Sequence, residues 1–338
     1  AMSSHITIKD IAKAIGCAPS TVSRALKDSP NISAPVKEAI QTYAREHNYR
    51  PDAVALSLRN SRSNTVGVLL PQIVHYFFSC VISGIEKAAS EAGYNIIVAQ
   101  SGESYEKEVA AVEAFRKAKV CGIIASLAKE TRDYTHFRRL LDDDIPLVFY
   151  DRICPDLNTS RVVVDDYTGT FTAVEHMIVT GCQRIAFYTS PLHLEISKNR
   201  RNGYLDALRK HRIAVDDRYI WECDTRHEAT ELTRRLLCNK ERPDAFFAVN
   251  ANTAVGILWA CKDAGLRVPD DISICGFSDD KMASSTEPPL TMVDQPGEAV
   301  GKGAMDLLLA KLNGTGDKPF FKNKIVKTEL ILRGSTKQ

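Results

Sequence analysis

The chain has 338 residues, of which 44% are hydrophobic and 25% are charged, and its formal net charge is +2. This length exceeds one ordinary hydrophobic core and predicts two or three domains. No apolar run approaches the ~20 residues of a membrane helix, and no apolar leader opens the chain. The nine cysteines are scattered singly, without a CxxC pair. We therefore expect a cytoplasmic protein with reduced thiols, no metal site and no membrane contact.

The charge is unevenly distributed along the chain. Residues 1–64 carry nine Lys and Arg against five Asp and Glu, whereas the remainder carries 35 against 37. A small basic segment attached to a nearly neutral body is typical of a contact with a polyanion.

The first 48 residues predict three short helices. Ile8, Ile11 and Ile15 recur at helical spacing, and Thr7 followed by Asp10 forms a capping box at the start of that helix. Gly16 ends the first helix and Pro19 begins the second. We expect the third helix to open at Ser33, to end near Asn48, and to turn inward the side chains of Val36, Ile40, Tyr43, Ala44 and His47.

The second helix has two unlike faces. Val22, Ala25 and Leu26 form its expected buried side. Short hydroxyls and cations are expected to point elsewhere, namely Ser20, Thr21, Ser23, Arg24 and Lys27. Such a helix after a tight Gly turn is typical of a helix-turn-helix, which places its second helix in the DNA major groove. The alternative is a small helical cap on an enzyme.

The two segments "TIKDIAKAIGCAPSTVSRAL" and "NYRPDAVALSL" resemble the LacI/GalR family of bacterial transcription regulators. The resemblance implies that Arg24 contacts a guanine edge and that Leu58 of a hinge helix at 52–59 wedges into the minor groove. Pro19 departs from the polar or aromatic residue often found at its position. The full set of DNA-contacting positions that we carry over is Thr7, Pro19, Ser20, Thr21, Ser23, Arg24, Asn31, Ala55 and Leu58.

From residue 65 the pattern changes to short apolar runs that alternate with helical stretches, which is typical of parallel α/β sheets. The resemblance implies a periplasmic-binding-protein-like body of two lobes. We therefore predict an α/β fold with an N-terminal three-helix helix-turn-helix head, a hinge helix and a two-lobe body. The expected bounds are 1–48 for the head, 49–64 for hinge and linker, 65–163 plus 294–323 for the first lobe, and 164–293 plus 324–338 for the second.

Ligands of open α/β sheets bind beyond the carboxyl ends of the strands. Aromatic rings, carboxylates, an amide and an arginine follow the predicted strands, and such groups stack on a sugar ring and bond its hydroxyls. These positions match the effector-contacting positions of the family: Phe77, Phe78, Asp151, Arg200, Phe247, Asn250, Ser278 and Asp279. Phenylalanines at positions such as 77 and 247 are more often core residues than ligand contacts. At least one of Asp165 and Asp166 is expected to cap the next helix.

Two departures from the family pattern make the expected pocket less acidic. Ser278 in "GFSDD" stands where a sugar-binding carboxylate is usual, and Ala251 follows Asn250 where an Asp is common. Phosphorylated, uronic or nucleobase-like effectors are thereby admitted beside plain sugars.

The sequence therefore predicts a homodimeric repressor that binds a pseudo-palindromic DNA operator and is switched by a small molecule, most simply a sugar or a sugar derivative. We expect the dimer contacts near 78–92, 105–118 and 252–264. No nucleotide-binding or hydrolase motif is present, so an enzyme and a cofactor are not expected. The alternatives left open are a regulator controlled by a protein corepressor and a solute-binding protein.

Overall fold

The computed structural model describes residues 6–47, 49, 63–314 and 321–338. The chain divides after Ser63 into two compact units, which are described separately. We call them the head and the body.

The head contains three helices that enclose a small apolar core. Gly16 ends the first helix in the left-handed conformation, with φ of 73°, which glycine adopts without strain. Ile11, Val22 and Ile40, one from each helix, are completely buried. The helices are α1 (Ile8–Ile15), α2 (Pro19–Leu26) and α3 (Ala34–Glu46).

Two residues expected in the core of the head lie at its surface. Val36 is exposed near the start of α3. His47 follows the last residue of α3, where its exposed ring stacks on Tyr43 with 4.0 Å between the ring centroids. The predicted buried stripe of α3 was one turn too long at each end, where no other helix covers α3.

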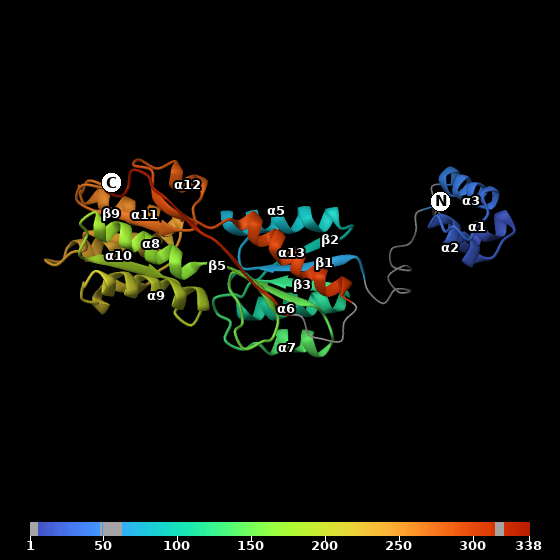
Figure 1. Cartoon of the computed structure of the whole chain (residues 1–338), viewed down its shortest axis with the longest axis horizontal. Helices are drawn as coiled ribbons and strands as arrows, with labels where there is room; N and C mark the ends of the chain where they lie inside the picture. The colour runs from blue at the N-terminus through green and yellow to red at the C-terminus, as the bar shows by residue number, and fades with distance from the viewer. Residues whose placement is uncertain (1–5, 48, 50–62, 315–320) are drawn as a thin grey trace. The chain divides into compact units, whose positions relative to one another are not determined.

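The body contains two six-stranded sheets, one in each lobe (Figure 1). The first sheet is parallel throughout and has the order β11-β5-β4-β3-β1-β2. Its strands are β1 (Thr65–Leu70), β2 (Asn95–Gln100), β3 (Gly122–Ala125), β4 (Leu147–Tyr150), β5 (Ser160–Val164) and β11 (Asn323–Val326).

The second sheet has the order β12-β10-β9-β8-β6-β7 and is parallel except for β12, which pairs antiparallel with β10. Its strands are β6 (Ile185–Thr189), β7 (Ile220–Glu222), β8 (Ala245–Ala248), β9 (Ser273–Phe277), β10 (Thr291–Asp294) and β12 (Glu329–Ile331).

Helices cover both faces of each sheet, as the continuous apolar strands predict. In the first lobe, α5 (Tyr76–Glu91) and α13 (Gly297–Asn313) lie side by side on one face, and α6 (Tyr105–Lys117) and α7 (Thr135–Asp142) on the other (Figure 1). In the second lobe, α8 (Asp166–Val179) and α9 (Glu195–Lys210) cover one face, and α10 (Arg226–Leu237) and α11 (Ala251–Asp263) the other. A short helix, α12 (Lys281–Ser284), follows β9.

Glycines set the close packing of α5 against α13. A Cβ atom on Gly84 would collide with the backbone oxygen of Glu298, and one on Gly301 with that of Val81. The two helix backbones therefore touch directly at these positions, which fixes where α13 crosses the first sheet.

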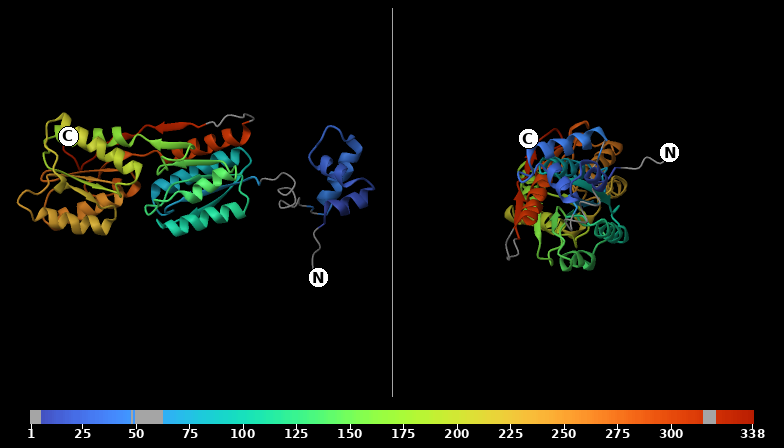
Figure 2. Two further views of the ribbon diagram at one scale, coloured as in Figure 1. Left: turned by 90° about the horizontal axis from the view of Figure 1, so that it is seen from below. Right: turned by 90° about the vertical axis from the view of Figure 1, so that its right-hand side faces the viewer.

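The chain passes between the lobes three times, at residues 164–166, 294–297 and 326–329 (Figure 2). The crossings shift the three expected lobe boundaries. Val164 pairs within the first sheet and Asp294 within the second, each one residue from its expected bound. The third boundary shifts further. Strand β11 pairs with β5 of the first sheet, so residues 324–326, which were assigned to the second lobe, belong to the first. Its partner strand lies some 160 residues earlier, which is why neighbouring residues gave no sign of it.

Candidate functional site

The exposed face of α2 carries hydrogen-bonding and cationic groups. Pro19, Ser20 and Arg24 are exposed, and Thr21 is half-buried. Among the described residues, no carboxylate lies within ion-pair distance of Arg24. Burial of Val22 and Ala25 against α1 and α3 fixes which face of α2 is turned outward. The free donors of Arg24 suit the O6 and N7 acceptors of guanine.

Ser23 was expected on the same face, and the structure places it elsewhere. Only 9% of Ser23 is exposed. It follows Val22 of the buried stripe directly and lies beside that stripe on α2.

The other expected DNA-contacting residues fall into two groups. Thr7 and Asn31 are exposed. The Thr7 hydroxyl also caps α1, because it accepts from the Asp10 amide at 3.3 Å and donates to the Asp10 carboxylate at 2.6 Å. These bonds lower the pKa of Asp10. Ala55 and Leu58 lie outside the described residues.

A pocket of about 250 Å³ opens between the two lobes of the body. Its walls are built from the segments that follow the strands, as expected for open α/β sheets. Six of the eight expected effector-binding residues line it: Phe77, Phe78, Asp151, Arg200, Asn250 and Ser278.

The first turn of α5 supplies an aromatic wall. Phe77 and Phe78 are 8% and 4% exposed and meet edge to face at 5.3 Å. Phe78 also packs edge-on against Tyr150, at 6.3 Å between centroids. The rings are therefore held by the core on one side while they line the pocket on the other.

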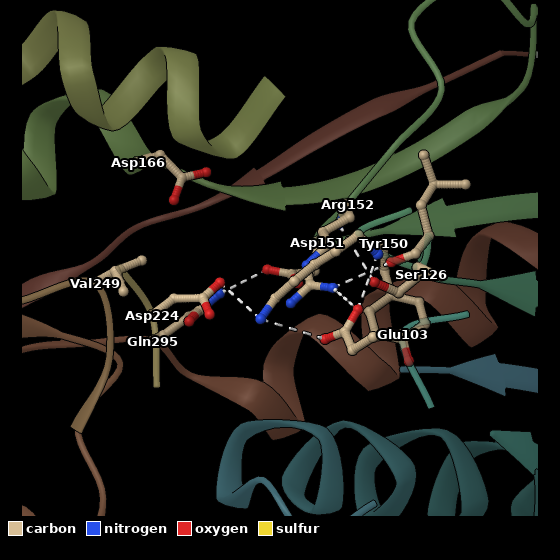
Figure 3. Close-up of polar contacts among 12 residues, drawn as sticks. Glu103, Ser126, Tyr150, Asp151, Arg152, Asp166, Asp224, Val249 and Gln295 are labelled. Atoms are coloured by element: carbon tan, nitrogen blue, oxygen red, sulfur yellow. Dashed lines mark hydrogen bonds and ion pairs between the residues drawn. The ribbon is translucent and has the colours of Figure 1, made fainter. Parts of the chain in front are cut away.

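Asp151 and Arg152 follow β4 directly, and both are buried. Asp151 adopts a left-handed conformation, with φ of 56°, and its carboxylate accepts from the Gln295 amide at 3.0 Å. Burial raises the pKa of Asp151, and Arg152 and Arg200 oppose that rise. Figure 3 shows Asp151 and Arg152 beside Glu103 and facing Asp224 of the second lobe.

Arg200 of α9 is held by three contacts. Its Nε donates to the Asp166 carboxylate at 2.7 Å, its Nη1 donates to the Val249 carbonyl at 3.2 Å, and its guanidinium lies 3.7 Å from the centroid of the Phe277 ring. Burial raises the pKa of Asp166 to about 6, although Arg200 pulls it down. The guanidinium is thus fixed in place before any ligand arrives.

Asn250 and Ser278 have structural roles beside their place in the pocket. Asn250 caps α11 by accepting from the Thr253 amide at 2.9 Å, and it donates to the Asp224 carbonyl at 2.9 Å. Ser278 is half-buried and left-handed, with φ of 63°. Of the two acids that follow β5, Asp165 caps α8 by accepting from the Thr168 amide at 3.0 Å, which confirms the expected capping role.

Phe247 and Asp279 do not line the pocket. Phe247 is completely buried within β8 and stacks on Phe187 at 5.3 Å, because side chains within a strand point to the sheet faces and not beyond its end. Both carboxylate oxygens of Asp279 bind Arg333, at 2.8 and 2.6 Å. Asp279 therefore anchors the segment after β12.

Several charged or polar residues of the pocket were not among the expected ones. They also follow strands, so their position was a usable signal, but strand ends supply more polar residues than one ligand can contact. The pocket residues missed in this way are Glu103, Lys129, Arg152, Asp224, Arg226 and Gln295.

Within the described residues, no three or more His, Cys, Asp or Glu side chains are grouped so that they could hold a metal ion. In the same part of the chain, no helix combines the length and the apolar character needed to cross a membrane.

A helix-turn-helix head joined to a two-lobe α/β body with a pocket between its lobes defines the class of ligand-responsive regulators. The family description "Bacterial regulatory proteins, lacI family" matches residues 7–52, and "Periplasmic binding protein-like domain" matches residues 174–336. The chain is 31% identical over 312 residues to the HTH-type transcriptional repressor PurR of Vibrio atlanticus (strain LGP32), covering 90% of this chain and 92% of that protein. It therefore belongs to the lacI family of bacterial regulatory proteins.

Two further relatives extend over nearly the whole chain. The HTH-type transcriptional repressor CytR of Escherichia coli (strain K12) is 31% identical over 335 residues, covering 98% of this chain and 96% of that protein. A solved structure of the lac repressor dimer bound to operator and the anti-inducer ONPF is similar with a TM-score of 0.86 and 25% identity, covering 98% of this chain and 99% of that one. The expected family and fold class are thereby confirmed.

Proposed function

We propose that this chain is a transcriptional repressor that binds a specific DNA operator through its head. A small molecule bound in the body changes the affinity of the head for that operator. The observation that carries the DNA-binding part is the exposed face of α2, where Ser20 and Arg24 stand clear of the head core. Relatives over the full length are repressors by name.

Selection of bound duplexes from a random pool tests this function. The intact chain should enrich one sequence family, and Arg24→Ala should lose preference at the base pair that Arg24 reads. Arg45→Ala removes an exposed arginine from α3 and is the matched control. Failure of the intact chain to enrich any sequence over random competitor would contradict the function.

We infer that the repressor acts as a homodimer whose two heads bind the halves of a pseudo-palindrome. The body has exposed apolar residues suited to self-association. Ile97 and Val98 on the edge strand β2 are 46% and 37% exposed, and Trp259 on α11 is 50% exposed. The α11 surface agrees with the expected dimer contact at 252–264, whereas β2 was not anticipated. Light scattering should give twice the chain mass, and Ile97→Asp should lower it.

The pocket suits a polar effector of about one sugar ring. Its volume of about 250 Å³ is close to the lower end of the ~300–1,000 Å³ that small-molecule pockets occupy. Phe77 and Phe78 offer apolar faces, and Asp151 and Arg200 offer an acceptor and a donor for hydroxyl groups. A sugar or sugar derivative fits this combination, and the lac repressor structure holds ONPF.

A thermal-shift screen against sugars, sugar phosphates, uronates and nucleobases tests the effector class. A ligand of the pocket should raise the melting temperature of the intact chain, and Phe77→Ala should weaken that rise. Ser278→Asp restores a carboxylate to the pocket and should favour neutral sugars over sugar phosphates. A hit whose effect persists unchanged in both variants would bind elsewhere.

A further inference from the structure

An ion pair joins the two lobes at the wall of the pocket. The Lys129 ammonium, in the loop after β3 of the first lobe, lies 2.6 Å from a carboxylate oxygen of Asp224, which follows β7 of the second lobe. Their side chains are 25% and 11% exposed, so water screens this pair less than a surface pair.

Lys129 belongs to a chain of alternating charges that starts in the first lobe. The Arg152 Nη1 atom donates to Glu103 Oε2 at 2.7 Å, and the Lys129 backbone amide donates to the same oxygen at 2.9 Å. The Lys129 ammonium lies 4.0 Å from the other Glu103 oxygen. Figure 3 shows Glu103, Arg152 and Asp224 turned toward this region.

Among these charged contacts, only the ion pair of Lys129 with Asp224 depends on how the two lobes are placed relative to each other. Arg152, Glu103 and Lys129 all follow strands of the first sheet and move together, whereas Asp224 belongs to the second sheet. Opening of the pocket must therefore separate Lys129 from Asp224 and leave the other links intact. Separation also leaves each charge in a partly desolvated position, because the remaining neighbours stay packed around it.

The backbone of Lys129 also lies near His193, in the segment between β6 and α9 of the second lobe. Burial lowers the pKa of His193, and the nearby Lys129 backbone partly opposes that fall. The ion pair of Lys129 with Asp224 is therefore the contact between the lobes on which the inference rests.

We propose that Lys129 is a positioning residue that acts as a latch, because its ion pair with Asp224 stabilises the closed arrangement of the lobes. The latch thereby sets the effector concentration at which DNA binding changes. This inference rests on the proposed repressor function. Because a ligand between the lobes stabilises whichever state it binds better, a latch that favours the closed state lowers the ligand concentration needed for the switch.

Double electron–electron resonance on the full-length chain tests the latch without any ligand. Spin labels attach to ketone-bearing amino acids that replace Lys117 on the first lobe and Lys240 on the second, both exposed. Labelled chains are mixed with excess unlabelled chains, so that each labelled molecule reports one distance between its own lobes. Lys129→Gln and Asp224→Asn should each lower the ratio of closed to open molecules about tenfold.

The double variant separates a latch from two unrelated effects. If the residues act as one pair, Lys129→Gln with Asp224→Asn should shift the ratio no further than either substitution alone. Lys198→Gln is the matched control, because it breaks a 2.6 Å ion pair with Glu195 that lies within one helix of the second lobe. It should leave the ratio unchanged.

An unchanged ratio in the single variants, or additive shifts in the double variant, would overturn the latch. Thermal unfolding measured beside each sample confirms that the variants are folded. The outcome is independent of the proposed function, because the duplex selection on the unlabelled wild-type chain tests that function alone. A chain that selects an operator and shows no distance change retains its function and loses the latch.

Discussion

Two cations in the head and three in the pocket differ in exposure and in whether they are paired with carboxylates. Arg24 of α2 and Lys27, which directly follows α2, are exposed, and no carboxylate among the described residues lies within ion-pair distance of either. In the pocket, Lys129, Arg152 and Arg200 each contact a carboxylate at 2.6 or 2.7 Å. Arg24 and Lys27 are therefore held in water, whereas these three cations of the pocket are paired with carboxylates and largely buried.

This difference has a physical reason. An exposed cation stays solvated and therefore costs the folded protein little free energy. A phosphate backbone can also approach it without displacing a protein partner. A buried cation without a partner would be costly, so the pocket supplies a carboxylate that also fixes its direction. Substitution of Arg24 or Lys27 should therefore change DNA binding and leave stability unchanged, whereas substitution of the paired cations of the pocket should change both ligand binding and stability.

The largest test of this contrast is Arg200→Ala. It leaves the buried Asp166 carboxylate without its cation and removes the stacking on Phe277. We expect the free energy of unfolding to fall by about 3–5 kcal/mol, measured by urea denaturation of the full chain. Lys210→Ala, at the exposed end of the same helix, is the control. A loss below about 1 kcal/mol would mean that Arg200 is held for the ligand and not for the fold.

The second test uses the pH dependence of the same pair. The pKa of Asp166 is raised to about 6 from 3.8, so the folded protein holds this proton more tightly than the unfolded chain does. The resulting stabilisation is complete below pH 3.8 and is lost as the pH rises through 6. In Asp166→Asn this loss is absent.

The measurement is the difference in unfolding free energy between wild type and Asp166→Asn at several pH values. Wild type should lose up to about 3 kcal/mol relative to the variant between pH 4 and pH 7. A difference that grows in favour of wild type over that range would show that Arg200, rather than burial, dominates the ionisation of Asp166.

The third test moves to the head. Arg24→Ala removes an exposed guanidinium without a carboxylate partner, so the unfolding free energy should change by no more than about 0.5 kcal/mol. Operator discrimination should fall by about 1–3 kcal/mol at one base pair, measured by titration with operators substituted at single positions. A uniform loss across all operators would instead assign Arg24 to the phosphate backbone.

These contrasts also show how far the sequence could predict the site. Strand ends located the pocket, because parallel strands place their carboxyl ends at one edge of a sheet, and this was enough for Asp151. Arg200 lies within α9, and its place in the pocket was predicted from the family resemblance. The position of strand ends failed for Phe247, which lies inside β8 and not beyond its end. It failed for Asp279 because the partner that takes its carboxylate, Arg333, lies 54 residues away.

The charged residues that meet at the wall of the pocket were not predicted, for a related reason. Glu103, Lys129 and Asp224 each follow a strand, yet which of many such residues meet depends on how the two lobes face each other. In the head, helical spacing alone decided which residues are buried, and it was accurate for Ile11, Val22 and Ile40. Ser23 shows its limit, because a small residue beside the buried stripe gives little sign of its own burial.

The smallest test concerns Thr7, where stability and DNA contact overlap. The Thr7 hydroxyl caps α1, so Thr7→Ala should destabilise the head by about 0.5–2 kcal/mol, and Thr7→Ser should keep the cap. Hydrogen exchange of the α1 amides in the full chain measures this local loss. If capping is the whole role of Thr7, saturating operator should bring the Ala variant to the same bound state as wild type, and the loss in affinity should equal the loss in head stability. A larger loss in affinity would place Thr7 in contact with DNA, and would show that one side chain of the head serves both stability and recognition, as Arg200 is proposed to do in the pocket.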